Sequence, residues 1–316
     1  MKFSIHTGNH FSNPGIADTV RFLKFALQDC GQDARINTGI DPARINLVME
    51  HFVDDASVQR IRAGFDAGAR FILIGTEPII NGVFNGGIDA HHAHYSNSDY
   101  WRKRYDAFVS MIPFADAIWV LAEGMVADYQ ALAPNRPVLF LPHGHVQRFE
   151  FYRHVPEQDK DIDFYFSGSL TEHRKAVLQA LSARYQVIFD HQHTPDYLRF
   201  DHLSRSRVCL SLRLSQANVI PSVSRMHFHL QHGNYLLHER YPNRCALDPY
   251  VLHIPVEELI ESAEAALALP ARRETAAGIT QRFRAEMPMS RLLPPILDAS
   301  LARAASRVVS LNLCMP

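Results

Sequence analysis

Residues 161–174 read DIDFYFSGSLTEHR, in which an apolar run passes into small residues and then into polar ones. The run from Ile162 to Phe166 predicts a buried strand, because four of its five residues are apolar or aromatic. Ser167, Gly168 and Ser169 then predict a tight loop where the backbone can closely approach a ligand. Beyond Arg174, apolar side chains recur at helical spacing. This strand–loop–helix unit is the building block of parallel α/β sheets.

The same alternation of strands and helices runs through both halves of the chain. Strands are predicted at 2–7, 45–49, 71–75, 117–121, 137–141, 162–166, 186–189, 208–212 and 235–237. Residues 143–161 are polar and irregular, which predicts a linker, and residues 255–310 predict C-terminal helices. We therefore expect an α/β fold of two tandem Rossmann-like, doubly wound domains, residues 1–150 and 151–316, facing a central cleft.

Composition and charge exclude several classes of protein. The 316 residues include 32 Lys and Arg against 33 Asp and Glu, so a general basic surface for nucleic acid is not expected. No apolar run approaches the roughly 18 residues of a membrane span. The N-terminal residues predict a strand rather than a signal peptide, and the cysteines lie far apart. We expect a cytoplasmic protein with no stable membrane insertion and no nucleic-acid partner.

The 18 histidines often stand in close pairs, such as His191 and His193. Such spacing invites a metal-site interpretation, but no cysteine or carboxylate partner stands at a recognisable metal spacing, and no HExxH motif occurs. Compositional bias is the favoured interpretation, and a metal-dependent enzyme stays a remote alternative. We expect no metal and no cofactor.

Residues 221–239 read PSVSRMHFHLQHGNYLLHE and predict a helix that begins near Ser222, ends before Gly233 and leads into a strand. Ser222 and Ser224 lie at the helix N-terminus, where free N–H groups and a partial positive charge favour an anion. The arginines that could contact phosphate oxygens in pairs are Arg174, Arg213 and Arg225. Together these features predict a diphosphate site in the cleft.

The two quoted segments resemble the donor-binding domain of GT-B glycosyltransferases, and the second is similar to a segment of the spore-maturation glycosyltransferase group. The positions that agree in spacing are Arg225, Gly233 and Glu239. The resemblance implies a nucleotide-diphosphate sugar as donor and no Asp-x-Asp metal motif. One position departs from the pattern, because Phe228 replaces the acid that contacts the ribose in many relatives. The expected donor-binding residues are Ser167, Gly168, Ser169, Arg174, Arg213, Ser222, Ser224, Arg225 and Glu239.

By the same resemblance, the acceptor docks in the first domain, after the first strand. Polar residues that follow strands in this half are expected to contact it, namely Asn9, Asp18 and Glu50. An inverting transferase needs a base that takes the proton of the acceptor hydroxyl. The candidates for this base are His10, Glu77 and His143. A retaining mechanism needs no such base, and both outcomes stay open.

The sequence thus predicts a metal-independent hexosyltransferase that moves a sugar from a nucleotide-diphosphate sugar to an acceptor hydroxyl. The acceptor would be a glycan, a lipid-linked molecule or a protein. Two alternatives stay open. A catalytically silent GT-B-like binding or scaffold protein would account for Phe228, and a sugar-nucleotide epimerase of the same fold would need no acceptor.

Overall fold

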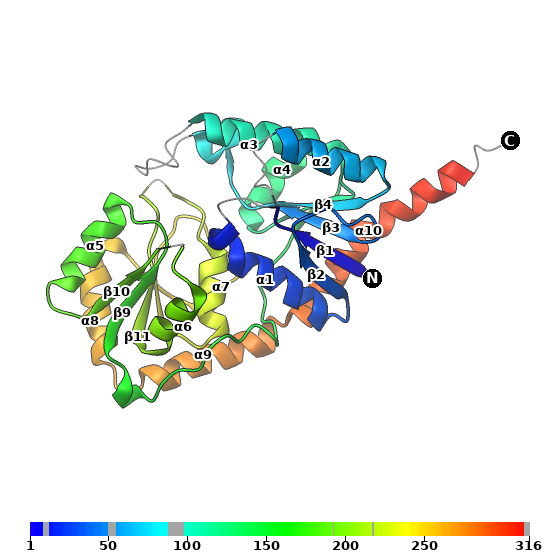
Figure 1. The fold of residues 1–316 in the computed structure, drawn as a ribbon. Helices are drawn as coiled ribbons and strands as arrows, with labels where there is room; N and C mark the ends of the chain where they lie inside the picture. The colour runs from blue at the N-terminus through cyan, green and yellow to red at the C-terminus, as the bar shows by residue number, and fades with distance from the viewer. Residues whose placement is uncertain (9–12, 50–54, 88–97, 192, 217, 313–316) are drawn as a thin grey trace.

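The computed structural model describes residues 1–8, 13–49, 55–87, 98–191, 193–216 and 218–312, which form two α/β units side by side (Figure 1). The helices are α1 (Asn13–Asp29), α2 (Asp55–Asp66), α3 (Ser98–Met111), α4 (Val126–Leu132), α5 (Glu172–Ser182), α6 (Asp196–Ser204), α7 (Val223–Gln231), α8 (Leu259–Ala268), α9 (Arg272–Glu286) and α10 (Met289–Asn312). The strands are β1 (Lys2–His6), β2 (Asp33–Asn37), β3 (Ile45–Met49), β4 (Arg70–Gly75), β5 (Ile79–Ile80), β6 (Val83–Phe84), β7 (Ala117–Val120), β8 (Val138–Phe140), β9 (Ile162–Ser167), β10 (Val187–Asp190), β11 (Ser206–Ser211), β12 (Leu236–Glu239) and β13 (Leu252–Ile254).

Each unit is built on a parallel sheet. The first has the strand order β2-β1-β3-β4-β7-β8 and the second β10-β9-β11-β12-β13. In both sheets the direction of winding reverses beside the first strand, between β1 and β3 and between β9 and β11. The expected fold class, two doubly wound parallel sheets with C-terminal helices, is confirmed.

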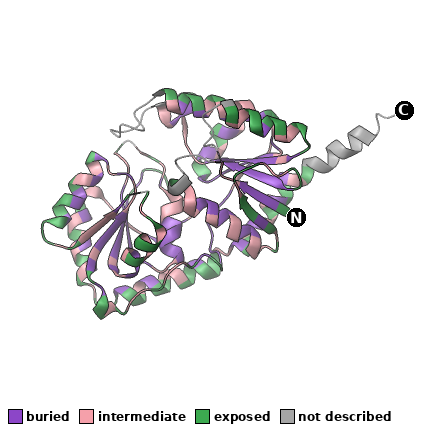
Figure 2. Cartoon of the chain, viewed as in Figure 1, coloured by how far each residue is buried: buried purple, intermediate pink, exposed green. Residues whose placement is uncertain are grey.

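Apolar strands covered on both faces hold each sheet in the interior. All five residues of β3 are buried, as are five of the six residues of β4. Figure 2 shows the buried class concentrated in the strands and in the helix faces between the units. Continuous apolar runs are what a parallel sheet with helices on both faces requires.

Some short strands escape the sequence pattern. β2 lies at the edge of its sheet, and only Ala34 of its DARIN sequence is buried, so it lacks the apolar run that predicts a strand. β13 has only three residues and also forms an edge. Between β4 and α3, the short strands β5 and β6, which the sequence pattern did not predict, form a small antiparallel hairpin.

The connection after β8 is irregular, as expected, but it is not a solvated linker. Val146 and Phe149 are fully buried. Gln231 of α7 bonds both backbone groups of Val146, at 3.0 Å to the N–H and 2.8 Å to the carbonyl. The stretch leads from β8 to β9 as a linker does, but it is packed against the second unit, because its apolar side chains are buried and α7 bonds the backbone of Val146.

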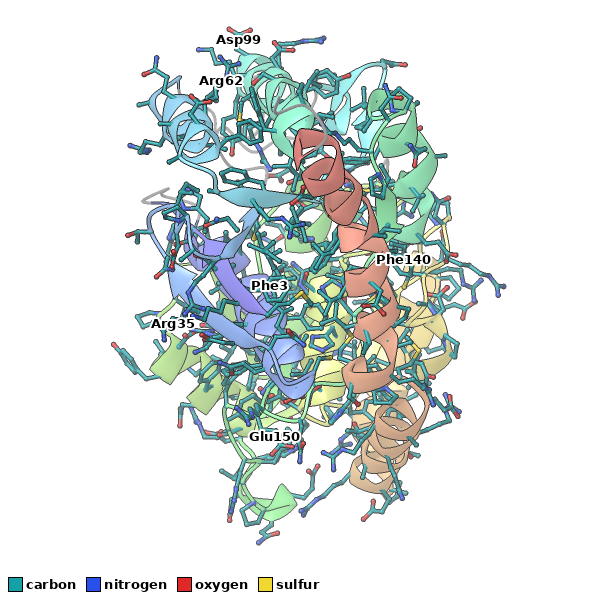
Figure 3. All side chains as sticks on the ribbon, turned by 90° about the vertical axis from the view of Figure 1, so that its right-hand side faces the viewer. Phe3, Arg35, Arg62, Asp99, Phe140 and Glu150 are labelled. Carbon is teal, nitrogen blue, oxygen red and sulfur yellow. The ribbon has the colours of Figure 1, made fainter. Side chains whose placement is uncertain are left out.

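The chain returns to the first sheet at its end. Trp119 of β7 donates its indole N–H to the hydroxyl of Ser300 in α10 at 2.7 Å. Figure 3 shows α10 continuing from α9 along the first unit. The division of the chain at residue 150 stays a prediction. Within the described residues, no helix combines the length and the apolar character that crossing a membrane requires.

Candidate functional site

Among the described residues, two adjoining pockets lie between the units. The histidine pocket, about 390 Å³, is lined by Gly15, Ala17, Asp18, Thr19, Arg21, Ser167, Gly168, His191, His193, Thr194, Pro195, Asp196, Arg199, Leu203, Ser222, Ser224, Arg225, Phe228 and His229. The large pocket, about 880 Å³, is lined by Gly15, Thr76, Glu77, Pro78, Ile80, Asn81, Asn85, Gly86, Trp101, Gly168, Ser169, Arg174, Leu214, Ser215, Gln216, Asn218, Val219, Ile220, Pro221, Ser222, Arg225 and Tyr241. They share Gly15, Gly168, Ser222 and Arg225, a set that we call the junction.

The junction lies at the switch point of the second sheet. Ser167 ends β9 and Gly168 follows it, while Leu214 and Ser215 follow β11, the neighbouring strand across the reversal. Open parallel sheets bind ligands beyond the carboxyl ends of the strands at such a reversal. The topology therefore directs a ligand to the loops that line the two pockets.

Position 168 requires a glycine, both for its backbone conformation and for the space that the Arg225 side chain occupies beside it. Its φ is +135°, a conformation that residues with a side chain rarely adopt. A Cβ at this position would lie 2.7 Å from Nη2 of Arg225. The missing side chain thus lets the Arg225 guanidinium lie directly against the loop that follows β9.

Arg225 is a partly buried cation without an acidic partner in the described chain. Its Nη1 is buried and has no hydrogen-bond acceptor, and its guanidinium lies 5.5 Å from the centre of the Phe166 ring. Burial lowers the pKa of Arg225 from its ordinary value, but the guanidinium stays charged at neutral pH. A partly buried charge whose Nη1 has no acceptor is costly, so an anion at the junction would stabilise the protein.

Two helix N-termini also point their partial positive charges toward the junction. α1 of the first unit begins beside Gly15, and α7 of the second begins after Ser222. Neither helix has an acidic residue in its first turn, and the Ser222 side chain makes no capping hydrogen bond. The two helices are joined by a 2.9 Å contact between the hydroxyls of Thr19 and Ser224. This arrangement favours a multiply charged anion.

The other two predicted arginines hold loops in place. Arg174 donates to the carbonyls of Ser169 at 2.7 Å, Leu212 at 2.9 Å and Arg213 at 3.0 Å. Arg213 donates to the carbonyl of Asn218 at 2.8 Å. Their guanidinium groups therefore fix the loops after β9 and β11. Of the three, only Arg225 leaves a buried N–H donor without an acceptor in the described chain.

The carboxylate of Glu239 is also bonded to other groups of the protein. It is fully buried, accepts the backbone N–H of Arg213 at 2.8 Å, and contacts Nε2 of His173 at 2.9 Å. It lines neither pocket. Phe228 reaches the histidine pocket, but as an apolar ring beneath the Arg199 guanidinium, 4.7 Å away. The Glu239 carboxylate is therefore not available to a ligand, and Phe228 has no carboxylate.

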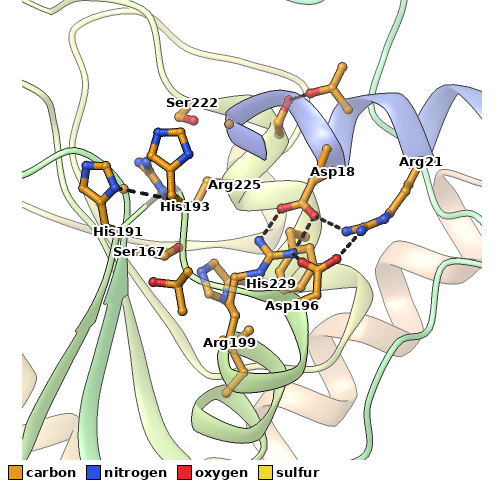
Figure 4. A pocket seen from close by; sticks show the side chains of 18 of the residues that line it. Asp18, Arg21, Ser167, His191, His193, Asp196, Arg199, Ser222, Arg225 and His229 are labelled. Atoms are coloured by element: carbon orange, nitrogen blue, oxygen red, sulfur yellow. Dashed lines mark hydrogen bonds and ion pairs between the residues drawn. The ribbon is translucent and has the colours of Figure 1, made fainter. Parts of the chain in front are cut away.

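Asp18 lies in a network of charges that joins α1 to α6 (Figure 4). Its two oxygens accept from Arg199 at 2.7 and 2.8 Å. Arg21 pairs with Asp196, and Arg199 also lies 3.4 Å from Asp196. This network forms one wall of the histidine pocket and connects the two units. The carboxylate of Asp18 is thus paired within the protein, whether or not a sugar acceptor is bound.

His143 lies behind the histidine pocket rather than in it. Its ring stacks on Phe22 with a centroid distance of 4.4 Å, and its Nε2 is 3.3 Å from the Ser224 hydroxyl. Burial lowers the pKa of His143 to about 3, which makes it a weak base at neutral pH. His143 therefore reaches the cleft only through Ser224.

Glu77 faces the large pocket from the first unit. Its carboxylate accepts from Asn85 at 2.8 Å and lies 3.4 Å from Nη2 of the buried Arg104. These partners fix the carboxylate across the cleft from the loops after β9 and β11. Of the three predicted bases, Glu77 alone lines a pocket in the described chain. Asn9, His10 and Glu50 lie outside the described residues.

Tyr241, Arg199 and the pair His191 and His193 line the pockets but were not predicted as site residues. Tyr241 lies two residues beyond β12, so the strand-end rule that selected Glu77 could have found it. The histidine pair was visible in the sequence. In the described chain, no three His, Cys, Asp or Glu side chains are grouped as a metal site would need.

No family model and no curated protein matches this chain. The β-glucosyltransferase of phage T4, described as a DNA modifying enzyme with the substrate uridine diphosphoglucose, is similar in structure. One of its structures is 11% identical with a TM-score of 0.56, covering 95% of this chain and 99% of that chain. A TarM mutant of S. aureus, solved with Fondaparinux, α-GlcNAc-glycerol and UDP, is 6% identical with a TM-score of 0.50. That match covers 82% of this chain and 56% of the TarM chain, so this chain spans little more than half of TarM.

The chain has the GT-B fold. Because the identities are so low, the likeness shows the fold alone, and the similarity to the spore-maturation group stays a prediction. In this chain the two pockets meet at the junction, whose residues come from both α/β units.

Proposed function

We propose that this protein is a glycosyltransferase that moves a sugar from a nucleotide-diphosphate sugar to an acceptor hydroxyl, without a metal ion. The observation that carries the proposal is the convergence on one point of Arg225, Gly168 and the N-termini of α1 and α7. These groups supply charge and N–H donors for a diphosphate, and they come from both units.

The proposed chemistry follows from that placement. As the bond between the sugar and the diphosphate breaks, its electron pair passes to the phosphate oxygen. Arg225 and the helix N-termini stabilise this developing charge in the place of a metal ion. Glu77 is the proposed base that takes the proton of the acceptor hydroxyl. Contact of the diphosphate with both units would keep the cleft closed and exclude water.

The experiment is calorimetric titration with UDP, GDP, ADP, dTDP and CMP, with and without EDTA, followed by assays of sugar transfer with the nucleotide that binds. One nucleoside diphosphate is expected to bind in the micromolar range, about −8 kcal/mol, and to be unaffected by EDTA. One T4 β-glucosyltransferase structure is described as a complex with UDP and Mn²⁺, which makes the EDTA arm informative.

Each outcome separates the alternatives. Loss of binding in EDTA would overturn metal independence, and absence of all nucleotide binding would overturn the donor site. Binding without transfer to glycan, lipid-linked or protein acceptors would favour the silent binding protein. Isomerisation of the sugar without any acceptor would favour the epimerase.

A further inference from the structure

Tyr241 has an unusual setting at the edge of the large pocket. Its ring contacts the Arg213 guanidinium, 5.4 Å from the ring centre, and the imidazole of His238, which stacks at 5.2 Å with 11° between the planes. The residue is only 8% exposed, and it lines the pocket. Burial raises the pKa of Tyr241, so its hydroxyl stays protonated at neutral pH.

This setting restricts what Tyr241 can contact. The contacts with Arg213 and His238 hold the ring in place, and only a small part of the side chain is open to the pocket. Its hydroxyl makes no hydrogen bond to any residue of the described chain, and it is not among the buried polar atoms that lack partners. The exposed part of the side chain in the pocket is therefore a hydroxyl that can donate and accept a hydrogen bond.

The distance from the junction indicates which part of a nucleotide the hydroxyl meets. Gly168 follows β9 and Tyr241 follows β12, two strands away in the same sheet. Neighbouring strands lie about 4.8 Å apart, so the strands that lead to these two residues are about 10 Å apart. With the phosphates at the junction, the ribose falls toward Tyr241, between the phosphates and the far loops of the large pocket.

The carboxylates that could otherwise hold a ribose are not available here. Glu239 is bonded to the Arg213 backbone and His173, and the position three residues after Arg225 is Phe228. Resting on the proposed function, we infer that Tyr241 binds the ribose hydroxyls of the donor nucleotide. Arg213 and His238 act as positioning residues that hold its ring.

Calorimetry on the full chain tests this inference with two ligands. One is the nucleoside diphosphate that binds the wild-type protein, and the other is its 2′,3′-dideoxy analogue. Tyr241→Phe keeps the ring and removes only the hydroxyl. We expect it to weaken the ribonucleotide by about tenfold, the value of one hydrogen bond, and to leave the dideoxy analogue unchanged.

A matched control is Tyr250→Phe. The hydroxyl that it removes donates to Glu286 at 2.6 Å, and Tyr250 lines neither pocket. It should leave both affinities unchanged. Equal weakening of both ligands by Tyr241→Phe, or no weakening of either, would overturn the ribose contact while the donor site stands. If the wild-type protein binds no nucleotide, the proposed function fails and this inference fails with it.

Discussion

Arg174, Arg213 and Arg225 carry the same charged group at the same cleft, but their surroundings give them different roles. The first two donate to backbone carbonyls and so fix the loops. Arg225 keeps a buried nitrogen without an acceptor in the described chain and lies against Gly168. At the residue scale, the site depends on one uncompensated guanidinium and on the glycine that makes room for it.

Replacing Gly168 with alanine should damage the junction in two ways. The φ of +135° becomes strained, which costs about 1–3 kcal/mol, and the new Cβ displaces Arg225. We expect nucleoside diphosphate affinity to fall by about tenfold or more, since a charge-assisted contact is lost. Calorimetry together with urea unfolding measures both effects. Gly124→Ala is the control, because nothing lies within 4 Å of its added Cβ. An unchanged affinity in Gly168→Ala would contradict the account.

Glu77→Gln should separate catalysis from donor binding. The amide keeps the size of the side chain but cannot take a proton, so the transfer rate should fall by about 100-fold or more. Nucleotide affinity should stay unchanged, because Glu77 lies across the cleft from the junction. The comparison is the transfer rate of Glu123→Gln, which alters an exposed glutamate of the same unit. A wild-type rate in Glu77→Gln would remove it as the base.

Residue types at strand ends could be read from the sequence, and their partners could not. Ser222, Gly168 and Arg225 were predicted and line the junction. Arg174 and Glu239 were predicted by the same reasoning, but a sequence does not reveal which backbone groups a loop will leave for them. Tyr241 could have been selected by its place just beyond β12, but its contacts with Arg213 and His238 are brought together only by the tertiary structure.

At the scale of elements, apolar strands were predictable, the edge strands β8 and β10 included, and the edge strands β2 and β13 were not. β3 and β4 are buried on both faces and therefore read as apolar runs. Both β2 and β13 lie at sheet edges. Only one residue of β2 is buried, and β13 is three residues long, so neither has a long apolar run. The order of the strands places β9 and β11 together, and so fixes where the ligand loops meet.

α1 and α6 are joined by the Asp18–Arg199 pair, and Asp18→Asn should weaken that contact. The change leaves Arg199, whose side chain is 15% exposed, with a poorer partner. We expect the free energy of unfolding to fall by about 2 kcal/mol, as for hydrogen bonds to charged groups. Urea unfolding measures it. Glu172→Gln breaks an exposed ion pair with Lys175 and should cost less than about 0.5 kcal/mol. Equal effects of the two changes would contradict a structural role for Asp18.

At the scale of the whole molecule, the two units meet through aromatic rings and histidines. His227 of α7 lies edge-on against Phe22 and His143 of the first unit, with ring centres 4.8 and 5.6 Å away, and His232 at the end of α7 lies 5.8 Å from Phe149. Burial lowers the pKa of His143 to about 3 and that of His232 to about 4. These rings are therefore neutral in the folded protein, which lets them pack as aromatic groups.

This interface should make the protein unstable in mild acid. Below pH 6.5, the unfolded chain protonates these histidines while the folded chain does not, so stability falls as the pH drops from 6.5 toward 4. Each such histidine contributes up to about 1.4 kcal/mol per pH unit in that window. The urea midpoint should be lower at pH 5 than at pH 7. A midpoint that does not change between these values would contradict the burial of neutral histidines.

The central claim is that the diphosphate of a nucleotide binds Arg225 at the junction between the two units. The most direct test titrates wild-type protein and Arg225→Ala with one nucleoside, its monophosphate and its diphosphate. The account predicts that the substitution weakens the diphosphate by at least about tenfold, and that the affinity of the nucleoside stays unchanged. Equal weakening of all three ligands, or no weakening of the diphosphate, would contradict it.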